Sequence, residues 1–220
     1  MNKNAIIITG SNGITARELI TYFSNSFDVV IGITRNSNVI FNKSNINIID
    51  FDLSTSNQRT DLIEKIKLNH TSIDAWVNCI GGFDVGMGID NDNNNWDKMY
   101  NINFITCLHG SQIALRIMKD QGYGKIINIG SRAAIDGFPN AAPYLVSKSS
   151  VHSLTKYIAL ENSNSNITCN AILPSIIDTP ENRLAMPNED FSTWETPNQI
   201  AKLIEKIINS NKTGELIYVS

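Results

Sequence analysis

Residues 5–16 read AIIITGSNGITA, an apolar run that passes at once into a glycine-containing turn and the start of a helical pattern. Gly10 and Gly13 allow the backbone to turn tightly and to approach a pyrophosphate closely, and the helix that follows directs its N-terminal amides at that phosphate. Ala16 is small enough for close packing of helix against strand. The alternative is a plain glycine-rich turn. The spacing predicts a dinucleotide-binding loop whose cofactor contacts are Gly10, Asn12, Gly13 and Ile14.

The same alternation of strand and helix continues along the chain. Apolar runs of strand length recur between segments whose apolar residues have helical spacing. The expected strands are residues 5–9, 29–34, 46–49, 75–80, 125–129, 167–173 and 215–219, and the expected helices lie within 16–23, 62–66, 96–118, 144–159 and 200–208. Continuous apolar strands indicate a sheet covered on both faces, and the βαβ alternation predicts a parallel sheet. We therefore expect one α/β domain over residues 1–220, a Rossmann-type doubly wound parallel sheet in three layers.

Composition limits the classes of partner. The 220 residues include 18% charged and 42% hydrophobic side chains and carry a net charge of −3. This balance gives no electrostatic reason to bind nucleic acid or an anionic membrane. Residues 1–4 lead into the first strand without the features of a signal peptide, and no apolar run approaches the roughly 20 residues that span a bilayer. We expect a cytoplasmic protein without a metal site, whose three thiols stay reduced: Cys79, Cys107 and Cys169.

The residues that follow the second, third and fourth strands bear on the choice of cofactor. After the second strand, Thr34-Arg35 stands where an acidic residue would bind the ribose 2′-hydroxyl of NAD. The planar guanidinium of Arg35 suits a 2′-phosphate, so we favour NADP(H) over NAD(H). The alternative is that Arg35 is a solvated surface cation. Further cofactor contacts are expected beside the adenine and the ribose, at Asp52, Leu53, Cys79 and Gly81.

A serine, a tyrosine and a lysine follow the fifth strand. Ser131 comes just after the strand, Tyr144 stands thirteen residues later, and Lys148 follows one helical turn further on. We expect the ammonium to lower the pKa of the phenol, which is near 10, roughly, in an isolated tyrosine. Tyr144 can then give a proton to a carbonyl oxygen as hydride arrives, or remove it in reverse, while Ser131 hydrogen-bonds that oxygen and Lys148 also anchors the nicotinamide ribose.

The histidines have no metal-binding spacing. His152 stands eight residues after Tyr144, too far along the helix to relay a proton to it, and we expect His152 and His109 to be structural.

Taken together, these motifs resemble the short-chain dehydrogenase/reductase family along essentially the whole chain. Residues 96–103, WDKMYNIN, are similar to the family segment that supplies a catalytic asparagine. The resemblance implies that Asn103 helps to hold a water in a proton relay to the lysine; the alternative is a polar residue that bridges the long helix. It also implies a homodimer or homotetramer, formed through the helices within 96–118 and 144–159.

A second family segment follows the sixth strand. Residues 170–179, NAILPSIIDT, are similar to the part of these enzymes that meets the nicotinamide carboxamide, through the backbone of Ile177 and the side chain of Thr179. Pro174 completes the cofactor contacts that this resemblance implies.

A narrower resemblance concerns residues 173–196, which are similar to the lid region of dihydropteridine reductases. The likeness implies a substrate lid over 180–196. Three lid residues either touch substrate or cap and close the lid: Asn182, Arg183 and Trp194. Ser131 and Thr34-Arg35 differ from those enzymes, and the full set of serine, tyrosine and lysine suits chemistry at a C=O or CH–OH group.

The sequence therefore predicts an NAD(P)-dependent oxidoreductase of the short-chain type, and within it an NADPH-dependent carbonyl reductase with a small-molecule carbonyl or alcohol substrate. A dihydropteridine-reductase-like enzyme is the alternative. A third possibility is a nucleotide-sensing protein without turnover. Such proteins usually lack the tyrosine or the lysine, whereas this chain has Ser131, Tyr144, Lys148 and Asn103.

Overall fold

The structure is a computed structural model that describes residues 4–55, 59–69, 72–85, 88–90 and 93–219. In this part of the chain, seven strands form one sheet in the order β3-β2-β1-β4-β5-β6-β7, and each neighbouring pair is parallel. The strands are β1 (Ala5–Thr9), β2 (Val29–Thr34), β3 (Ile46–Asp50), β4 (Ala75–Asn78), β5 (Tyr123–Ile129), β6 (Asn166–Leu173) and β7 (Leu216–Tyr218). The strand order reverses between β1 and β4, so the predicted doubly wound Rossmann-type sheet is confirmed.

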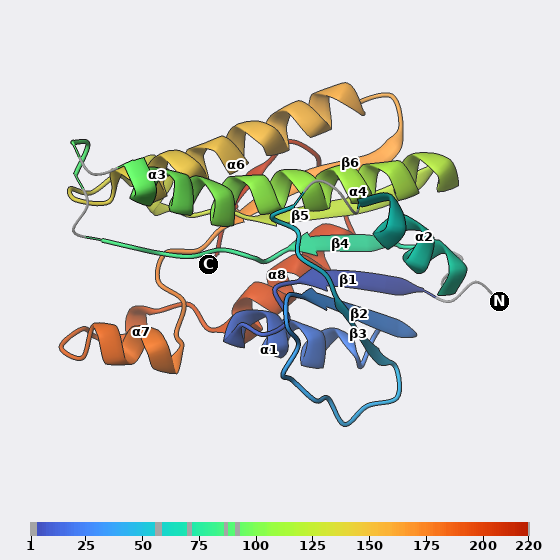
Figure 1. The fold of residues 1–220 in the computed structure, drawn as a ribbon, viewed down its shortest axis with the longest axis horizontal. Helices are drawn as coiled ribbons and strands as arrows, with labels where there is room; N and C mark the ends of the chain where they lie inside the picture. The colour runs from blue at the N-terminus through green and yellow to red at the C-terminus, as the bar shows by residue number, and fades with distance from the viewer. Residues whose placement is uncertain (1–3, 56–58, 70–71, 86–87, 91–92, 220) are drawn as a thin grey trace.

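Helices cover both faces of the sheet (Figure 1). The α-helices are α1 (Ile14–Phe23), α2 (Arg59–Asn69), α3 (Asn93–Tyr100), α4 (Thr106–Gln121), α5 (Ala133–Asp136), α6 (Ala142–Glu161), α7 (Pro180–Ala185) and α8 (Pro197–Ile208). Because side chains alternate across a strand, Ile6 and Ile8 of β1 pack with α1 and α8, whereas Ile7 packs with α2, α4 and α6. The result is the three-layer arrangement expected from the βαβ pattern.

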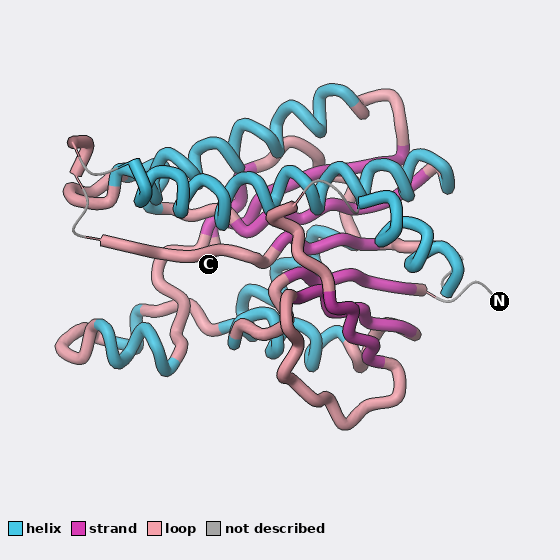
Figure 2. Tube along the Cα trace, in the orientation of Figure 1, coloured by secondary structure: helices cyan, strands magenta, loops and turns pink. Residues whose placement is uncertain are grey.

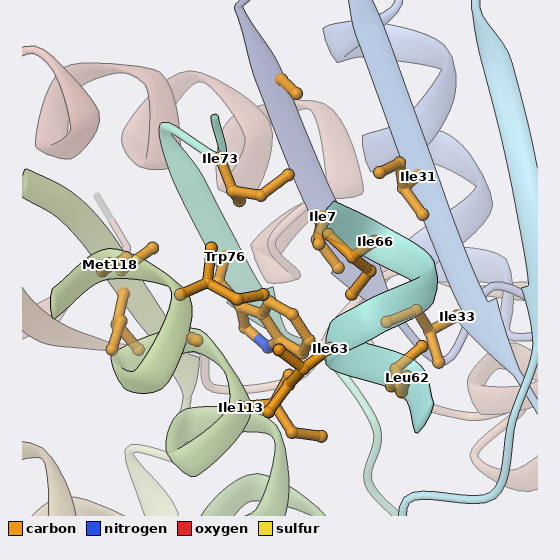
Figure 3. Packing of buried hydrophobic residues seen from close by; sticks show 14 of the residues in the cluster. Ile7, Ile31, Ile33, Leu62, Ile63, Ile66, Ile73, Trp76, Ile113 and Met118 are labelled. Carbon is orange, nitrogen blue, oxygen red and sulfur yellow. The ribbon is translucent and has the colours of Figure 1, made fainter. Parts of the chain in front are cut away.

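Trp76 of β4 lies at the centre of the core on the α2 and α4 side (Figure 3). Its side chain is fully buried, with Ile63 of α2, Ile113 and Met118 of α4 in the same cluster. The indole Nε1 donates a 2.8 Å hydrogen bond to Oδ1 of Asn78, so the buried polar atom has a partner. The large side chain of Trp76 thus packs together with α2 and α4 at the middle of the sheet.

Several boundaries differ from the sequence expectations (Figure 2). β4 ends at Asn78 rather than at residue 80, because the next two backbone N–H groups, of Cys79 and Ile80, donate to Oγ1 of Thr9 instead of extending the ladder. The long helix expected within 96–118 is interrupted by a π-helical turn, Asn101–Ile105, between α3 and α4. The short elements α5, α7 and the 3-10 turn Phe191–Thr193 were not predicted, because three to six residues are too few to display a periodicity.

All strands run in the same direction, so their carboxyl ends share one edge of the sheet. The loops after β1, β4, β5 and β6 gather there, and α7 projects from the same end (Figure 1). This edge is where ligands bind in open α/β sheets. Within the described residues, no helix has both the length and the apolar character needed to cross a bilayer.

Candidate active site

Ser131, Tyr144 and Lys148 are brought together at the carboxyl end of β5. Ser131 is buried two residues beyond the strand, and α6 carries the tyrosine and the lysine past it one turn apart. Pro143 stands in the first turn of α6, where a missing N–H costs no hydrogen bond, and the helix begins at Ala142, two residues before the tyrosine. The buried ammonium of Lys148 donates a 2.8 Å hydrogen bond to the carbonyl of Ile129. The three predicted catalytic side chains therefore share one site.

The electrostatics of the tyrosine differ from the sequence expectation. Burial raises the pKa of Tyr144 above its usual value, and the Ser131 hydroxyl offsets part of that shift. Burial and the Ser131 hydroxyl are the causes of the Tyr144 pKa shift, and Lys148 is not one of them; its ammonium donates to the carbonyl of Ile129, and burial lowers its own pKa. The expectation that the lysine lowers the pKa of the tyrosine is therefore wrong for this structure. The phenol is protonated at neutral pH, the state that a proton donor needs.

Asn103 is buried in the π-helical turn that joins α3 to α4. Its side-chain Oδ1 accepts a 2.9 Å hydrogen bond from the N–H of Gly82, and its Nδ2 donates to the carbonyl of Gly82 and to Oγ of Ser147, both at 3.0 Å. A π-turn adds a residue to the helical repeat and often marks a functional position. Asn103 therefore links the loop after β4 to α6, a structural role that differs from the expected bridge within the long helix, and its part in a proton relay stays a prediction.

The loop between β1 and α1 has the form of a phosphate cradle. Gly10 has a φ of 81°, and a Cβ there would meet Ile80 at 3.2 Å, so only glycine fits without strain. Gly13 is the N-cap of α1 and offers no side-chain cap, which leaves the amides that begin at Ile14 directed outward. Two buried oxygens of the loop have no hydrogen-bond partner in the described part of the chain: Oγ of Ser11 and Oδ1 of Asn12. Glycine backbone, open amides and orphaned polar atoms together fit the phosphates of a dinucleotide.

The residues beyond β2 and β3 lie next to this loop. Nδ2 of Asn12 donates to the carbonyls of Arg35 and Asn36, so the loop is fastened to the end of β2. The exposed guanidinium of Arg35 lies 3.6 Å from the carboxylate of Asp52. The side chain of Leu53 is buried in the core, and its carbonyl is 2.8 Å from Nδ1 of His109, so its place beside the adenine stays a prediction. Any contact of Leu53 with a cofactor would have to use the backbone.

The loop after β4 comes close to the lysine. A Cβ on Gly81 would lie 3.2 Å from Nζ of Lys148 and 3.1 Å from Oδ1 of Asn103, so this glycine leaves room beside the two side chains. Cys79 is anchored through its N–H to Thr9. Burial raises the pKa of the Cys79 thiol to about 12, so it remains protonated and is no nucleophile.

The segment after β6 forms a small closed unit. The side chain of Thr179 caps α7 by accepting from the N–H of Asn182, and Nδ2 of Asn182 donates to the carbonyl of Ile177. Arg183 binds Asp178 through two hydrogen bonds of 2.6 and 2.8 Å. These contacts favour a role of Asn182 and Arg183 in holding the segment together over direct contact with a substrate.

Three more positions complete this segment. The guanidinium of Arg183 lies over the ring of Phe191 at 4.9 Å, and that ring packs at 4.8 Å against the buried Trp194. Asn182, Arg183 and Trp194 therefore make contacts within this segment, and the expected role of the segment as a substrate lid stays a prediction. Pro174 accepts the N–H of Arg132 at 2.9 Å and so joins the loops after β5 and β6.

Sequence reasoning missed an aromatic surface beside the tyrosine. Phe83, in the loop after β4, meets the ring of Tyr144 edge to face at 4.9 Å and lies 6.4 Å from Phe138. The two phenylalanine side chains are 54% and 39% exposed, which is unusual for residues of this size. The motif Gly81-Gly82-Phe83 could have drawn attention to them, but nothing in a single sequence places two loops side by side.

His152 also has a contact that its sequence position did not suggest. Its Nε2 accepts a hydrogen bond of 3.3 Å from the backbone N–H of Ser131. His109, by contrast, has the expected structural role through its contact with Leu53. Among the residues that the structure describes, no group of three or more His, Cys, Asp or Glu side chains could hold a metal ion.

Comparison with known proteins agrees with this geometry. The sequence profile described as short chain dehydrogenase matches residues 3–190. The chain belongs to this family. The family resemblance inferred from the motifs is thereby confirmed, whereas the narrower likeness of the lid to dihydropteridine reductases finds no support in these matches.

Individual relatives of this short-chain dehydrogenase are distant. A 3beta-hydroxysteroid dehydrogenase of Mediterraneibacter gnavus is 32% identical over 177 residues, which cover 74% of this chain and 64% of that protein. The structure of ElxO with NADPH bound has a TM-score of 0.90 at 22% identity and covers 99% of this chain and 97% of that one. A 4-hydroxyisoleucine dehydrogenase complexed with NADH has a TM-score of 0.83 at 27% identity, with 98% and 96% covered. The chain thus spans less than two thirds of the hydroxysteroid dehydrogenase, and its solved neighbours include complexes of both cofactors.

Proposed function

We propose that this short-chain dehydrogenase is an oxidoreductase that interconverts a ketone and a secondary alcohol. The observation that carries the proposal is the cluster of buried Ser131 and Lys148 with half-buried Tyr144 at the carboxyl end of β5. In the reducing direction, the protonated phenol of Tyr144 gives its proton to the carbonyl oxygen, and Ser131 hydrogen-bonds the same oxygen as charge develops on it. Lys148, fixed on the carbonyl of Ile129, supplies the positive charge next to the site.

A nicotinamide cofactor, when bound, supplies or accepts the hydride. The residues proposed to hold its phosphates are Gly10, Asn12, Gly13 and Ile14, and those proposed to hold the nicotinamide end are Tyr144, Lys148, Pro174, Ile177 and Thr179. Arg35 is the feature that favours NADP(H), because its guanidinium lies at the end of β2 and is exposed enough to turn toward a 2′-phosphate. Asp52, Cys79 and Gly81 complete the proposed site beside the adenine and ribose, with Leu53 limited to its backbone.

The charges around the aromatic surface indicate an uncharged substrate. In the described residues of the loops at the carboxyl end of the sheet, 79–85, 88–90, 130–143 and 174–196, there are eight acidic side chains and only two basic ones. Both cations are already paired, Arg132 with Asp136 and Arg183 with Asp178. A carboxylate substrate would find no free cation on these loops and a field of like charge. We therefore propose an apolar ketone or alcohol whose ring or chain packs against Phe83 and Phe138.

We also propose a homodimer or homotetramer formed through α6 and the helical stretch of α3, the π-helical turn and α4. A shallow hollow of about 470 Å³ lies between Tyr100 of α3, Phe104 of the π-helical turn and one face of α6, where it is lined by Val146, Ser149, Ser150, Ser153, Leu154 and Tyr157. Apolar side chains gathered on one exposed face are typical of an interface. The three free cysteines are compatible with the reducing cytoplasm, which we propose as the location.

The function is tested by following NADPH and NADH absorbance separately with matched substrates. Methyl acetoacetate and acetoacetate carry the same ketone and differ by one negative charge, while cyclopentanone and a 3-ketosteroid extend the apolar range. We expect NADPH-dependent turnover of the uncharged ketones, with a far smaller kcat/KM for acetoacetate. Tyr144→Phe should lower kcat by about 100-fold or more, whereas Tyr157→Phe, on the exposed side of α6, should not.

Three results would argue against the proposal. Ketone turnover that survives Tyr144→Phe unchanged would remove the tyrosine from the chemistry. Preference for acetoacetate over its methyl ester would overturn the substrate class. Cofactor binding without turnover of any substrate would favour a nucleotide-sensing protein.

A further inference from the structure

One face of α6 is hydrogen-bonded to the end of β5 at successive helical turns. Lys148 donates to the last carbonyl of β5 at 2.8 Å. Two turns further on, Oγ1 of Thr155 accepts from Nδ2 of Asn128, also at 2.8 Å. Between them, Nε2 of His152 accepts the backbone N–H of Ser131 at 3.3 Å. Tyr144 begins this series, so residues 144, 148, 152 and 155 form one stripe of the helix that faces the strand.

The N–H of Ser131 needs this partner because no strand faces it. Gly130 still donates to Ile172 of β6 at 2.8 Å, and the next N–H of an extended chain points to the opposite side. The strand on that side, β4, ends at Asn78, which is paired with Asn128, so the ladder stops before it reaches Ser131. Ser131 is only 3% exposed, and water does not replace the missing strand easily. Nε2 of His152 accepts the N–H of Ser131 in the position where a carbonyl of a neighbouring strand would otherwise accept it.

The surroundings are fitted to a neutral imidazole. A Cβ on Gly130 would lie 2.6 Å from Nε2 of His152, so the glycine makes room for the ring. An accepting Nε2 carries no proton, which puts the ring proton on Nδ1. Burial, with smaller contributions from the charges of Lys148 and Lys156, lowers the pKa of His152 to about 4. The ring therefore stays neutral, and Nε2 remains an acceptor, at physiological pH.

We infer that His152 is a positioning residue for the reaction: it fixes the backbone of Ser131, and through it keeps the serine hydroxyl against the phenol of Tyr144. The strand ladder has ended at this point, and a serine held only by its neighbours could move its hydroxyl away from the reacting oxygen. The catalytic consequence rests on the proposed function, but the positioning itself is observable without turnover.

The first test reads the state of the ring and of the phenol directly. In ¹⁵N-labelled protein at pH 7, long-range ¹H–¹⁵N spectra should show His152 as the neutral tautomer protonated on Nδ1; a ring protonated on Nε2 would overturn the inference. The pKa of Tyr144 is then followed with ¹³Cζ-tyrosine. Since the Ser131 hydroxyl holds that pKa down, we expect His152→Leu to raise it as Ser131→Ala does. His152→Gln, whose side-chain oxygen can accept the same N–H, should stay close to the wild type.

The second test is a double-mutant cycle on ketone reduction, with methyl acetoacetate as the probe. We expect His152→Leu to lower kcat by about tenfold with little change in the KM for NADPH, and to have no further effect when it is combined with Ser131→Ala. Thr155→Val is the matched control, because it removes a buried hydrogen bond from the same helix face without touching Ser131. It should lower stability but leave the Tyr144 titration and kcat unchanged.

The outcomes separate this inference from the proposed function. If His152→Leu leaves both the titration and kcat at wild-type values, or costs as much in the Ser131→Ala background as in the wild type, His152 does not act through the serine. If the wild type turns over no ketone, the proposed function fails, and the tautomer and the Tyr144 titration still decide the positioning. If His152→Leu does not fold, the tautomer of the wild type and the comparison of His152→Gln with Thr155→Val decide it.

Discussion

The guanidinium of Arg35 lies 3.6 Å from the carboxylate of Asp52, across the ends of neighbouring strands β2 and β3. Asp52 is fixed by its own loop, since it accepts hydrogen bonds of 2.8 and 2.7 Å from the backbone and hydroxyl of Ser54. The side chain of Arg35 is 69% exposed, against 34% for Asp52, so the guanidinium is the less enclosed member of the pair. Such an exposed ion pair contributes little to stability, so the guanidinium can leave it for a 2′-phosphate at small cost.

Replacing Arg35 should therefore change the cofactor preference. We expect Arg35→Ala to weaken NADPH binding by about tenfold or more, as the loss of one charge-assisted hydrogen bond predicts, and to leave NADH binding unchanged. Titration calorimetry with each cofactor measures both values. Lys119→Ala, which removes an exposed cation from α4, controls for the change in net charge. Equal effects on the two cofactors, or none, would mean that Arg35 does not read the 2′-phosphate.

The raised pKa of Tyr144 has opposite consequences for the two directions of reaction. A raised pKa keeps the phenol protonated to higher pH, so ketone reduction should be flat around neutrality and decline only in the alkaline range. Alcohol oxidation needs the phenolate and should rise with pH over that same range. Ser131→Ala should move both limbs to higher pH, because the serine offsets part of the shift. The measurement is kcat as a function of pH for ketone reduction and for alcohol oxidation. The same pH dependence in both directions would contradict the prediction.

The sequence was sufficient for the features that depend on local pattern. Period and length placed β1 and β2 with their observed bounds, and the βαβ order led to the parallel sheet. Lys148 could be placed near Tyr144 because residues one helical turn apart lie on the same face. Each of these inferences uses only neighbours in the chain.

Features that depend on packing between distant segments could not be predicted. Leu53 has the sequence position of a cofactor contact, but its side chain is buried in the core on the α2 and α4 side of the sheet. Thr9 ends β4 early with its hydroxyl, a contact 70 residues away in sequence. His152 contacts Ser131 only because β4 stops short of it. The pKa of Tyr144 likewise depends on burial, which spacing does not reveal.

Gly110 of α4 lies against the buried amide network of the central strands. A Cβ at this position would come within 2.2 Å of Oδ1 of Asn78, whose amide also donates to Ser111 and Asn128. Gly110→Ala must therefore push α4 from the sheet or break the network. We expect a loss of about 1–3 kcal/mol in the free energy of unfolding, measured by urea denaturation. Lys119→Ala on the exposed side of α4 should cost far less, and an unchanged Gly110→Ala would show that the helix can shift freely.

The exposed face of α6 should decide the assembly. Tyr157 is 64% exposed and Val146 is 46% exposed, and both line the hollow between α6, α3 and the π-helical turn. A charge placed there would have to be desolvated in any interface, so we expect Tyr157→Glu to shift the protein from dimer or tetramer to monomer. Leu184→Glu is the matched control, because Leu184 is 82% exposed on α7, away from this face. Light scattering after gel filtration at several concentrations measures the mass of each variant. A wild type that is already monomeric at tens of micromolar, roughly the range in which a specific interface is populated, would contradict the interface, as would dissociation caused by Leu184→Glu instead of Tyr157→Glu.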